Sequence, residues 1–456
     1  MRHAERRCRL EVTMFPAPRG DRGLQALGAR VRLAALPQTR IPVTPHQLLG
    51  LADQCVKCGL CLPQCPTFAR LANESDSPRG RIALIQGWAA GELPMSTTLA
   101  RHLDGCLGCR ACEGACPSRV DYGHLADGAK AARVALLPPP RRAWLRTWLG
   151  LLSDARASRW LARAAMLYRR LGLWRLAEAT GVACLRWIRP LHRLTPAINR
   201  TARAVPPAAP PDPDLEIFVG CMGELAQGQA IAAARALLDR LGLRAVVPPA
   251  PRCCGALLRH NGLPVAGDRW RTACARLPGA PPLIGLSSAC VAELREAGGS
   301  ADTGELCDFL DRLPALDHLR PAPLDQRVLV HEPCSHRNLL GGNGAVYRLL
   351  QRIPRLNVGP LPDNETCCGA AGTYMIQQPG MAEALLRDKL AAIGDPPPQV
   401  IVTTNAGCAL HLIAGIREAG LSIEICHPVE LLERQVERSR PEAHTPRASP
   451  SRRTTA

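Results

Sequence analysis

The sequence predicts a multidomain chain of mixed α+β and α/β class, with a mostly helical N-terminal domain followed by two related α/β domains. Three observations predict this organisation. Eight cysteines lie in two closely spaced runs within residues 45–135. Four other cysteines recur twice, in the same order, in the C-terminal half. Proline-rich segments at residues 138–140 and 204–214 separate these parts of the chain.

Composition favours a globular protein that binds metal through cysteine. The chain has 456 residues, enough for two or three hydrophobic cores, and 46% of them are hydrophobic. It contains 21 cysteines but no apolar segment typical of a secretory signal, which favours metal ligation over disulfides and indicates the cytoplasm. No stretch reaches the roughly 18 uncharged apolar residues of a membrane span.

The formal net charge of +18 comes almost entirely from arginine. Basic proteins bind nucleic acid, membrane surfaces or acidic partners. Aromatic residues make up only 3% of the chain and no nucleic-acid motif is present, so nucleic acid is not an expected partner.

We expect six segments along the chain. They are a basic N-terminal extension (1–44), a cysteine-rich helical domain (45–135), a Trp/Arg-rich helical linker (136–213), two α/β domains (214–320 and 321–437) and a disordered tail (438–456).

The first eight cysteines form two copies of one motif. Residues 55–66 read CVKCGLCLPQCP and residues 106–117 read CLGCRACEGACP, both matching C-x2-C-x2-C-x3-C-P, the run that binds 4Fe–4S clusters in bacterial ferredoxins. In two-cluster ferredoxins the fourth cysteine of each run ligates the other cluster. We therefore assign one 4Fe–4S cluster to Cys55, Cys58, Cys61 and Cys116, and a second to Cys65, Cys106, Cys109 and Cys112. Zinc is the alternative, but zinc ribbons use paired C-x2-C units.

The C-terminal repeat is visible from its cysteines. The first copy comprises Cys221, Cys253, Cys254 and Cys290; the second comprises Cys334, Cys367, Cys368 and Cys408, offset by 113 to 118 residues. In each copy an apolar run leads into the first cysteine, a helical stretch follows, and another apolar run ends near the last cysteine. This alternation predicts parallel α/β units whose cysteines gather at the strand ends.

These motifs resemble a known family, the iron–sulfur subunits with a dicluster ferredoxin domain and two cysteine-rich CCG domains. The family includes glycolate oxidase iron–sulfur subunits, anaerobic glycerol-3-phosphate dehydrogenase subunits, lactate-utilisation proteins and heterodisulfide reductase subunits. The stretches SPRGRIALI (77–85), CPSRVDYGHL (116–125) and CCGAAGTYMIQQPGMAEALLRDKLAAI (367–393) are most similar to the glycolate oxidase members.

The resemblance implies an electron-transfer subunit in a complex with a flavoprotein that carries FAD and oxidises glycolate to glyoxylate. Electrons would then pass toward a quinone or a similar acceptor. No flavin fingerprint occurs in this chain, which agrees with a catalytic site on another subunit. The alternatives are a disulfide-reducing subunit of the heterodisulfide reductase type, and the same carrier role for lactate or glycerol 3-phosphate.

The chain departs from the fullest CCG pattern, which ends in C-x2-C. Glu293 and His411 occupy those last positions, so each domain offers four thiols, and whether the CCG domains bind a further cluster stays open. His411 is a candidate ligand. Five cysteines outside any spacing pattern are interpreted as structural: Cys8, Cys184, Cys274, Cys307 and Cys426. His331 and His336 flank Cys334 and His427 follows a strand; for each, packing and tuning of the site are both open.

The linker holds five of the seven tryptophans, Trp144, Trp148, Trp160, Trp174 and Trp187, among many arginines. Packing between domains is the favoured interpretation of these helices. An amphipathic helix at the inner face of the cytoplasmic membrane, where quinone is available, is the alternative.

Overall fold

The computed structural model describes residues 44–182, 185, 188–198, 212–248, 253–275, 279–296 and 302–439. Nearly all of the predicted N-terminal extension and tail lies outside these residues, as do Cys8, Cys184 and Trp187. Within them, no helix combines the length and apolarity needed to cross a bilayer.

The cysteine-rich N-terminal region is helical, as predicted. Its elements are α1 (Pro45–Ala52), α2 (Pro66–Leu71), η1 (Glu74–Asp76), α3 (Pro78–Ala89), α4 (Thr97–Asp104), α5 (Ala111–Gly114) and α6 (Tyr122–Ala135). Proline at the first helical position favours the start of α1, α2 and α3 because its φ already suits a helix. Leu48, Ile85 and Leu125 are buried where α1, α3 and α6 meet. This small core holds the two cysteine runs together.

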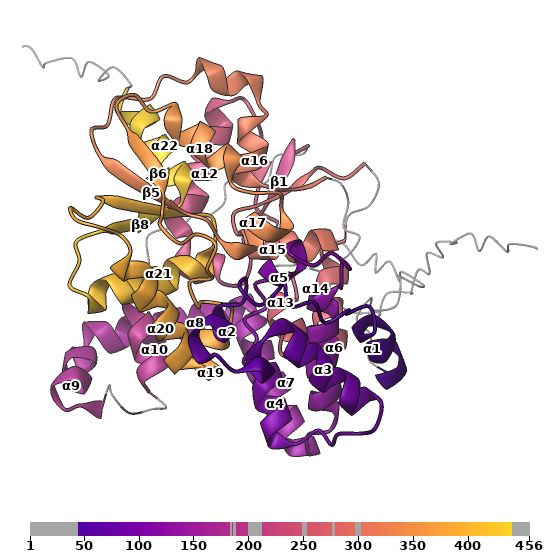
Figure 1. Cartoon of the computed structure of the whole chain (residues 1–456). Coiled ribbons are helices and arrows are strands. Elements are labelled where there is room, and N and C mark those ends of the chain that lie inside the picture. Colours follow the sequence, from indigo (N-terminus) through magenta and orange to yellow (C-terminus); the bar gives the residue numbers. More distant parts are fainter. Residues whose placement is uncertain are drawn as a thin grey trace, which may run out of the picture.

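The tryptophan-rich segment forms helices that contact both halves of the molecule. They are α7 (Pro139–Ser153), α8 (Ala155–Arg170), α9 (Leu173–Ala179) and α10 (Arg189–Leu194), followed by η3 (Thr195–Ala197). Helix α7 packs against α13, α8 against α11, and α10 against α21. In Figure 1 these magenta helices lie below the two sheets.

The first α/β unit is built on a parallel sheet in the order β2-β1-β3-β4. Its strands are β1 (Leu215–Phe218), β2 (Ala245–Val246), β3 (Leu283–Gly285) and β4 (Thr303–Glu305). Its helices are α11 (Gly223–Ala226), α12 (Gly228–Arg240), α13 (Ala256–Arg259), α14 (Pro264–Ala273), α15 (Ser288–Glu296), α16 (Leu306–Asp311) and η4 (Pro314–His318).

The second unit repeats this topology in a parallel sheet of order β6-β5-β7-β8. Its strands are β5 (Arg327–His331), β6 (Asn357–Pro360), β7 (Val400–Thr403) and β8 (Glu424–Cys426). Its helices are α17 (Cys334–Leu339), α18 (Gly344–Gln351), α19 (Tyr374–Gln377), α20 (Pro379–Ala391), α21 (Ala406–Glu418) and α22 (Pro428–Arg438). The predicted pair of related α/β domains is confirmed.

The two units share one hydrophobic core. Buried side chains from both, including Leu237, Leu310, Val346 and Leu432, belong to the same cluster. Helix α12 packs on α22 and α16 packs on α18, so the units face each other through equivalent elements (Figure 1). Their strand ends are therefore held in fixed relation to one another.

Candidate functional site

Both cysteine runs adopt the same loop conformation. In the first run Lys57 and Gly59 have φ of 57° and 86°; in the second, Gly108 and Arg110 have φ of 65° and 60°. The left-handed residues thus lie immediately before and after the second cysteine of each run. Such conformations are uncommon for residues other than glycine. They curl the loop so that the first three thiols of each run face one side.

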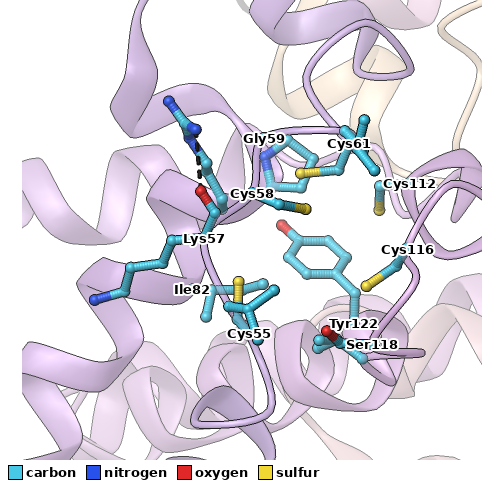
Figure 2. A pocket seen from close by; sticks show the side chains of 15 residues that line it. Cys55, Lys57, Cys58, Gly59, Cys61, Ile82, Cys112, Cys116, Ser118 and Tyr122 are labelled. Carbon is cyan, nitrogen blue, oxygen red and sulfur yellow. Dashed lines mark hydrogen bonds between the residues drawn. The ribbon is translucent and has the colours of Figure 1, made fainter.

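The first pocket gathers four of the predicted ligands. It is lined by Cys55, Cys58, Cys61 and Cys116, with Cys112 at its edge. In Figure 2 the sulfurs of these residues point toward a common space, and the ring of Tyr122 lies among them. The carbonyl oxygen of Lys57 accepts a hydrogen bond of 3.2 Å from Arg79, which ties the left-handed turn to α3.

The second pocket gathers the other four, Cys65, Cys106, Cys109 and Cys112. Cys65 is the N-cap residue of α2, so the proline that follows it turns the chain away as a helix. The backbone N–H of Gly108 donates to Cys106 Sγ at 3.4 Å. Cys112 and Tyr122 line both pockets, which places the two thiol sets next to each other.

Arg81 supplies a buried positive charge beside the second pocket. Its side chain is almost completely buried, and its guanidinium lies 4.0 Å from Cys65 Sγ and 3.6 Å from a carboxylate oxygen of Asp76. Burial raises the pKa of Cys106, but the charges of Arg81 and Lys130, together with the hydrogen bonds from Gly108 and Tyr122, lower that pKa overall. Burial raises the pKa of Cys109 and Cys112. Metal binding at this set would therefore release protons from buried thiols.

The four cysteines of the first CCG unit come together at the ends of its strands. Hydrogen bonds connect the thiols of Cys221 and Cys254 to Cys253, and that of Cys254 to Cys290. The two donated hydrogen bonds lower the pKa of Cys253. Gly255 has φ of 89° and a Cβ there would lie 2.2 Å from the carbonyl oxygen of Gly267, so only glycine fits after the cysteine pair.

The second CCG unit gathers its cysteines in the same way and adds a histidine. Hydrogen bonds link Cys334, Cys367, Cys368 and Cys408 in that order. His331, at the end of β5, has a ring nitrogen within 4.8 Å of the Cys368 and Cys408 sulfurs. The equivalent residue at the end of β1 is Phe218. The sequence signal that could have pointed to His331 is therefore a histidine where the first repeat has an apolar strand residue.

His411, expected as a candidate ligand, faces other partners. Its Nε2 lies 3.1 Å from the Ala382 carbonyl oxygen and its Nδ1 lies 3.5 Å from the Arg193 guanidinium. Glu293, at the corresponding position of the first unit, is buried and pairs with Arg259 at 2.7 Å. The residues that replace the final cysteines therefore make packing and ion-pair contacts, and His331 is the nitrogen that lies by the thiols.

The described cysteines outside the motifs are buried, and among them Cys274 packs beside the first CCG thiol set. The thiol of Cys274 donates to the Cys253 carbonyl oxygen at 3.4 Å, and Cys426 contacts Arg434 at 3.4 Å. Cys307 is fully buried in the core shared by the two α/β units. These positions agree with the structural role expected for them. His427 caps α22, and its Nε2 lies 3.1 Å from the Leu286 carbonyl oxygen.

The second ferredoxin-type pocket adjoins the second CCG thiol set. Leu107 and Cys109 pack in one apolar cluster with Cys334, Cys367, Cys368 and Cys408. The Asn338 side-chain amide of α17 donates to the Cys109 carbonyl oxygen at 2.8 Å. The Tyr374 hydroxyl donates to the Gly105 carbonyl oxygen at 3.2 Å. These contacts fix the two sites against each other.

The donor sets fit iron–sulfur clusters. Each pocket of the N-terminal region gathers a four-thiol set on curled loops. In the second pocket a peptide N–H and a tyrosine hydroxyl are also directed at the sulfur of Cys106. Thiolate sets with hydrogen bonds to sulfur are the protein environment of 4Fe–4S clusters.

Comparison with known proteins agrees with this chemistry. Residues 51–120 match the 4Fe-4S dicluster domain, and residues 215–277 and 328–413 match the cysteine-rich domain. The chain is 30% identical to the probable glycolate oxidase iron-sulfur subunit of Bacillus subtilis (strain 168), over 83% of this chain and 92% of that protein. It is 29% identical to the glycolate oxidase iron-sulfur subunit of Escherichia coli (strain K12), over 84% and 94%. Lactate utilization protein A of Geobacillus kaustophilus is 26% identical, over 48% of this chain and 98% of that protein. The chain belongs to the family of glycolate oxidase iron–sulfur subunits.

Proposed function

We propose that this chain is the electron-transfer subunit of a flavin-dependent glycolate dehydrogenase complex. The observation that carries the proposal is the pair of adjacent four-thiol pockets on one helical core. Iron–sulfur clusters, when bound, supply one-electron transfer. The chain contributes the ligands, the distances between sites and the exclusion of water.

The eight ferredoxin-type cysteines hold two 4Fe–4S clusters in this proposal. Cys55, Cys58, Cys61 and Cys116 hold one, and Cys65, Cys106, Cys109 and Cys112 hold the other. The membership of the two pockets supports this division, because Cys116 lies with the first run and Cys65 with the second. Zinc is not redox-active, so two zinc sites would not need to lie next to each other. Electron transfer between two clusters does require adjacent sites.

The second CCG thiol set is proposed as the next redox site along the chain. Beyond the effect of burial, Cys334 raises the pKa of Cys109 and Cys109 raises the pKa of Cys367, and all three lie in one apolar cluster. Buried Lys389 supplies positive charge near this thiol set and opposes the effect of burial, which raises the pKa of Cys408. The first CCG set has no such contact with Cys109 among the described residues, so it is assigned a separate role as a redox or cluster-binding site.

The family likeness supports a proposal for the partner and the acceptor. The glycolate-oxidising site, with its FAD, is placed on a partner flavoprotein, and the electrons leave toward a quinone or a similar acceptor. The named relatives include both glycolate oxidase subunits and a lactate utilization protein, so glycolate is the first choice of substrate class and lactate the second.

A peripheral membrane contact is supported by the linker helices. In the described part of the chain, 12 of the 18 exposed large apolar side chains lie between residues 144 and 191, and Trp144 and Trp160 are 66% and 68% exposed. Arg163 stacks over the Trp160 ring. Trp174 instead packs between His192 and Arg417 of α21, as the packing interpretation expects. The exposed face is suited to a lipid interface that carries quinone.

Anaerobic reconstitution tests the proposal directly. We expect about eight irons and eight sulfides per chain from the ferredoxin-type sites, with additional iron only if a CCG set also binds a cluster. The native complex should contain a flavoprotein that reduces this chain when glycolate is added. A colourless, iron-free chain would contradict the carrier role. Reduction of a disulfide substrate by the reduced chain alone would favour the heterodisulfide reductase alternative.

A further inference from the structure

A group of acidic and histidine side chains lies between the two CCG units, apart from the thiol sets. Glu305 and Asp308 come from the end of β4 and the start of α16, and His336 comes from α17 of the other unit. One ligand atom from each lies within 4.8 Å of the others. We propose that Glu305, Asp308 and His336 form a binding site for a divalent cation, such as Mn²⁺, Fe²⁺ or Zn²⁺, that joins the two units.

Glu305 offers an unused oxygen. Its side chain is fully buried. Oε2 caps α16 by accepting hydrogen bonds from the backbone N–H of Cys307 at 2.7 Å and of Asp308 at 3.1 Å. Oε1 is buried and has no hydrogen-bond partner. A buried oxygen without a partner costs free energy, so a cation at this position would remove a penalty that the fold otherwise carries.

His336 is oriented as metal-binding histidines are. It is fully buried, and its Nδ1 lies 2.9 Å from Thr404 Oγ1. When Nδ1–H donates to that hydroxyl, Nε2 carries the lone pair and faces the carboxylates. Nε2 has no hydrogen-bond partner and lies 3.5 Å from Asp308 Oδ2. A hydrogen bond at the far ring nitrogen is the usual outer support of a metal-bound imidazole.

The negative charge of the two carboxylates in this group favours the binding of a cation. Among the described residues, neither Glu305 nor Asp308 has an ion pair with arginine or lysine; Asp308 approaches only His336. Two carboxylates and a neutral imidazole would leave two negative charges in a largely buried site, and a divalent cation balances them. Carboxylate and imidazole donors suit Mn²⁺, Fe²⁺ and Zn²⁺. Protonation of His336 or of the buried Glu305 is the competing way to balance part of this charge.

The neighbouring histidine does not complete the site. His427 lies near Glu305 and Cys307, but its Nε2 is directed at the Leu286 carbonyl oxygen and its Nδ1 accepts from the Val429 N–H. The proposed ligand set is therefore Glu305, Asp308 and His336. Because His336 lies two residues after Cys334, a cation here would also fix the start of α17, which carries that thiol. This is a positioning role distinct from holding a cluster.

Manganese is the probe that separates this site from the cysteines, because Mn²⁺ prefers oxygen and nitrogen ligands to thiolates. The full, cluster-loaded chain is passed over a chelating resin and titrated anaerobically with Mn²⁺, and free Mn²⁺ is measured by electron paramagnetic resonance. We expect one Mn²⁺ bound per chain, and a weakening of about tenfold or more in Glu305→Gln and in His336→Gln. Asp308→Asn, at the more exposed ligand, provides a third variant if either of these fails to fold.

Asp311→Asn is the matched control. It removes one carboxylate from the same helix, one turn further on, where Asp311 pairs with Arg348 at 2.7 Å. Its Mn²⁺ affinity should equal that of the unaltered chain, and the iron content of all variants should stay constant. Absence of stoichiometric Mn²⁺ binding in the unaltered chain, or equal affinity in the ligand variants and Asp311→Asn, would overturn the site. The group would then be only an ion pair of His336 with Asp308.

Discussion

The hydroxyl of Tyr122 lies 3.6 Å from Cys106 Sγ and donates a hydrogen bond to it. Tyr122 is buried and its side chain lines both ferredoxin-type pockets. A donor to a cluster sulfur stabilises the more negative, reduced state and so raises the reduction potential. If Cys106 binds a cluster as proposed, this contact would be one means by which the chain sets the potential of that cluster.

Tyr122→Phe should keep the ring packing and remove only this hydrogen bond. We expect the potential of the Cys106 site to fall by a few tens of millivolts, up to about 60 mV, since a hydrogen bond contributes roughly 0.5–1.5 kcal/mol. A redox titration followed by electron paramagnetic resonance measures the shift. Tyr374→Phe, which loses only a hydrogen bond to the Gly105 carbonyl oxygen, is the control. Equal potentials in the unaltered chain and Tyr122→Phe would argue against the tuning role.

Cysteine variants test how the eight thiols are divided. Cys116→Ser should lose the same cluster signal as Cys58→Ser, and Cys65→Ser the same signal as Cys109→Ser, because the fourth thiol of each run lies in the other run's pocket. Iron from the ferredoxin-type sites should fall from about eight to about four per chain in each variant. Cys307→Ser, at a buried thiol away from both pockets, should retain the full amount. If Cys116→Ser instead matched Cys109→Ser, each run would bind its own cluster.

Arg81→Met should destabilise the N-terminal domain strongly. The buried guanidinium lies 3.6 Å from Asp76 Oδ1 and its Nε donates to the His102 carbonyl oxygen at 2.7 Å. Removing one partner of a buried pair leaves an uncompensated charge, so we expect a loss of about 3–5 kcal/mol in the free energy of unfolding by anaerobic urea titration. Arg79→Met, on the same helix with an exposed partner in Glu74, should cost much less, because solvent screens an exposed ion pair. Similar losses of stability in both variants would contradict the expectation that the buried ion pair contributes more than the exposed one.

Asp127 should make the contact between the N-terminal domain and the first CCG unit sensitive to acid. It is buried, which by itself raises its pKa, but His260 at 3.0 Å, Arg259 at 3.6 Å and Lys130 lower that pKa overall. A lowered folded-state pKa means that the stabilisation is complete above the unfolded value of about 3.9 and is lost as pH falls below it toward the folded value.

Asp127→Asn therefore should be less stable than the unaltered chain at pH 7, by about 3 kcal/mol, with the difference shrinking below about pH 4. Anaerobic urea titrations at several pH values measure this dependence. Asp121→Asn is the control, because its side chain is 43% exposed and its pairing with His124 should contribute about 1 kcal/mol or less. A difference between Asp127→Asn and the unaltered chain that did not change with pH would contradict the assignment.

The exposed tryptophans test the proposed membrane contact. Replacing Trp144 and Trp160 by serine should lower binding to vesicles of anionic lipid several-fold, because each indole loses its insertion into the interface. Val265→Ser removes an apolar side chain that is 62% exposed elsewhere on the molecule and should bind as the unaltered chain does. Sedimentation with vesicles at low and high salt gives the measurement. Absence of vesicle binding by the unaltered chain would leave packing as the role of these helices.

The sequence alone determined the features that depend on local spacing. The two C-x2-C-x2-C-x3-C-P runs predicted eight candidate ligands, because three thiols two residues apart must share one loop. The repeated cysteines and apolar runs identified two parallel α/β units, because strands and helices have distinct periods. The first prediction depends only on residues close together in the chain. The second depends only on a cysteine pattern that occurs twice in the sequence.

The tertiary structure decided what depends on which surfaces meet. His331 lies by the second CCG thiols and His411 does not, because the end of β5 reaches Cys368 and Cys408 while α21 turns His411 toward Ala382 and Arg193. Arg81 of α3 lies beside Cys106, which is 25 residues away in the sequence, and Glu305, Asp308 and His336 come from two different α/β units. No local pattern reports such contacts, because burial and charge at these sites are set by the packing of whole helices and sheets against each other.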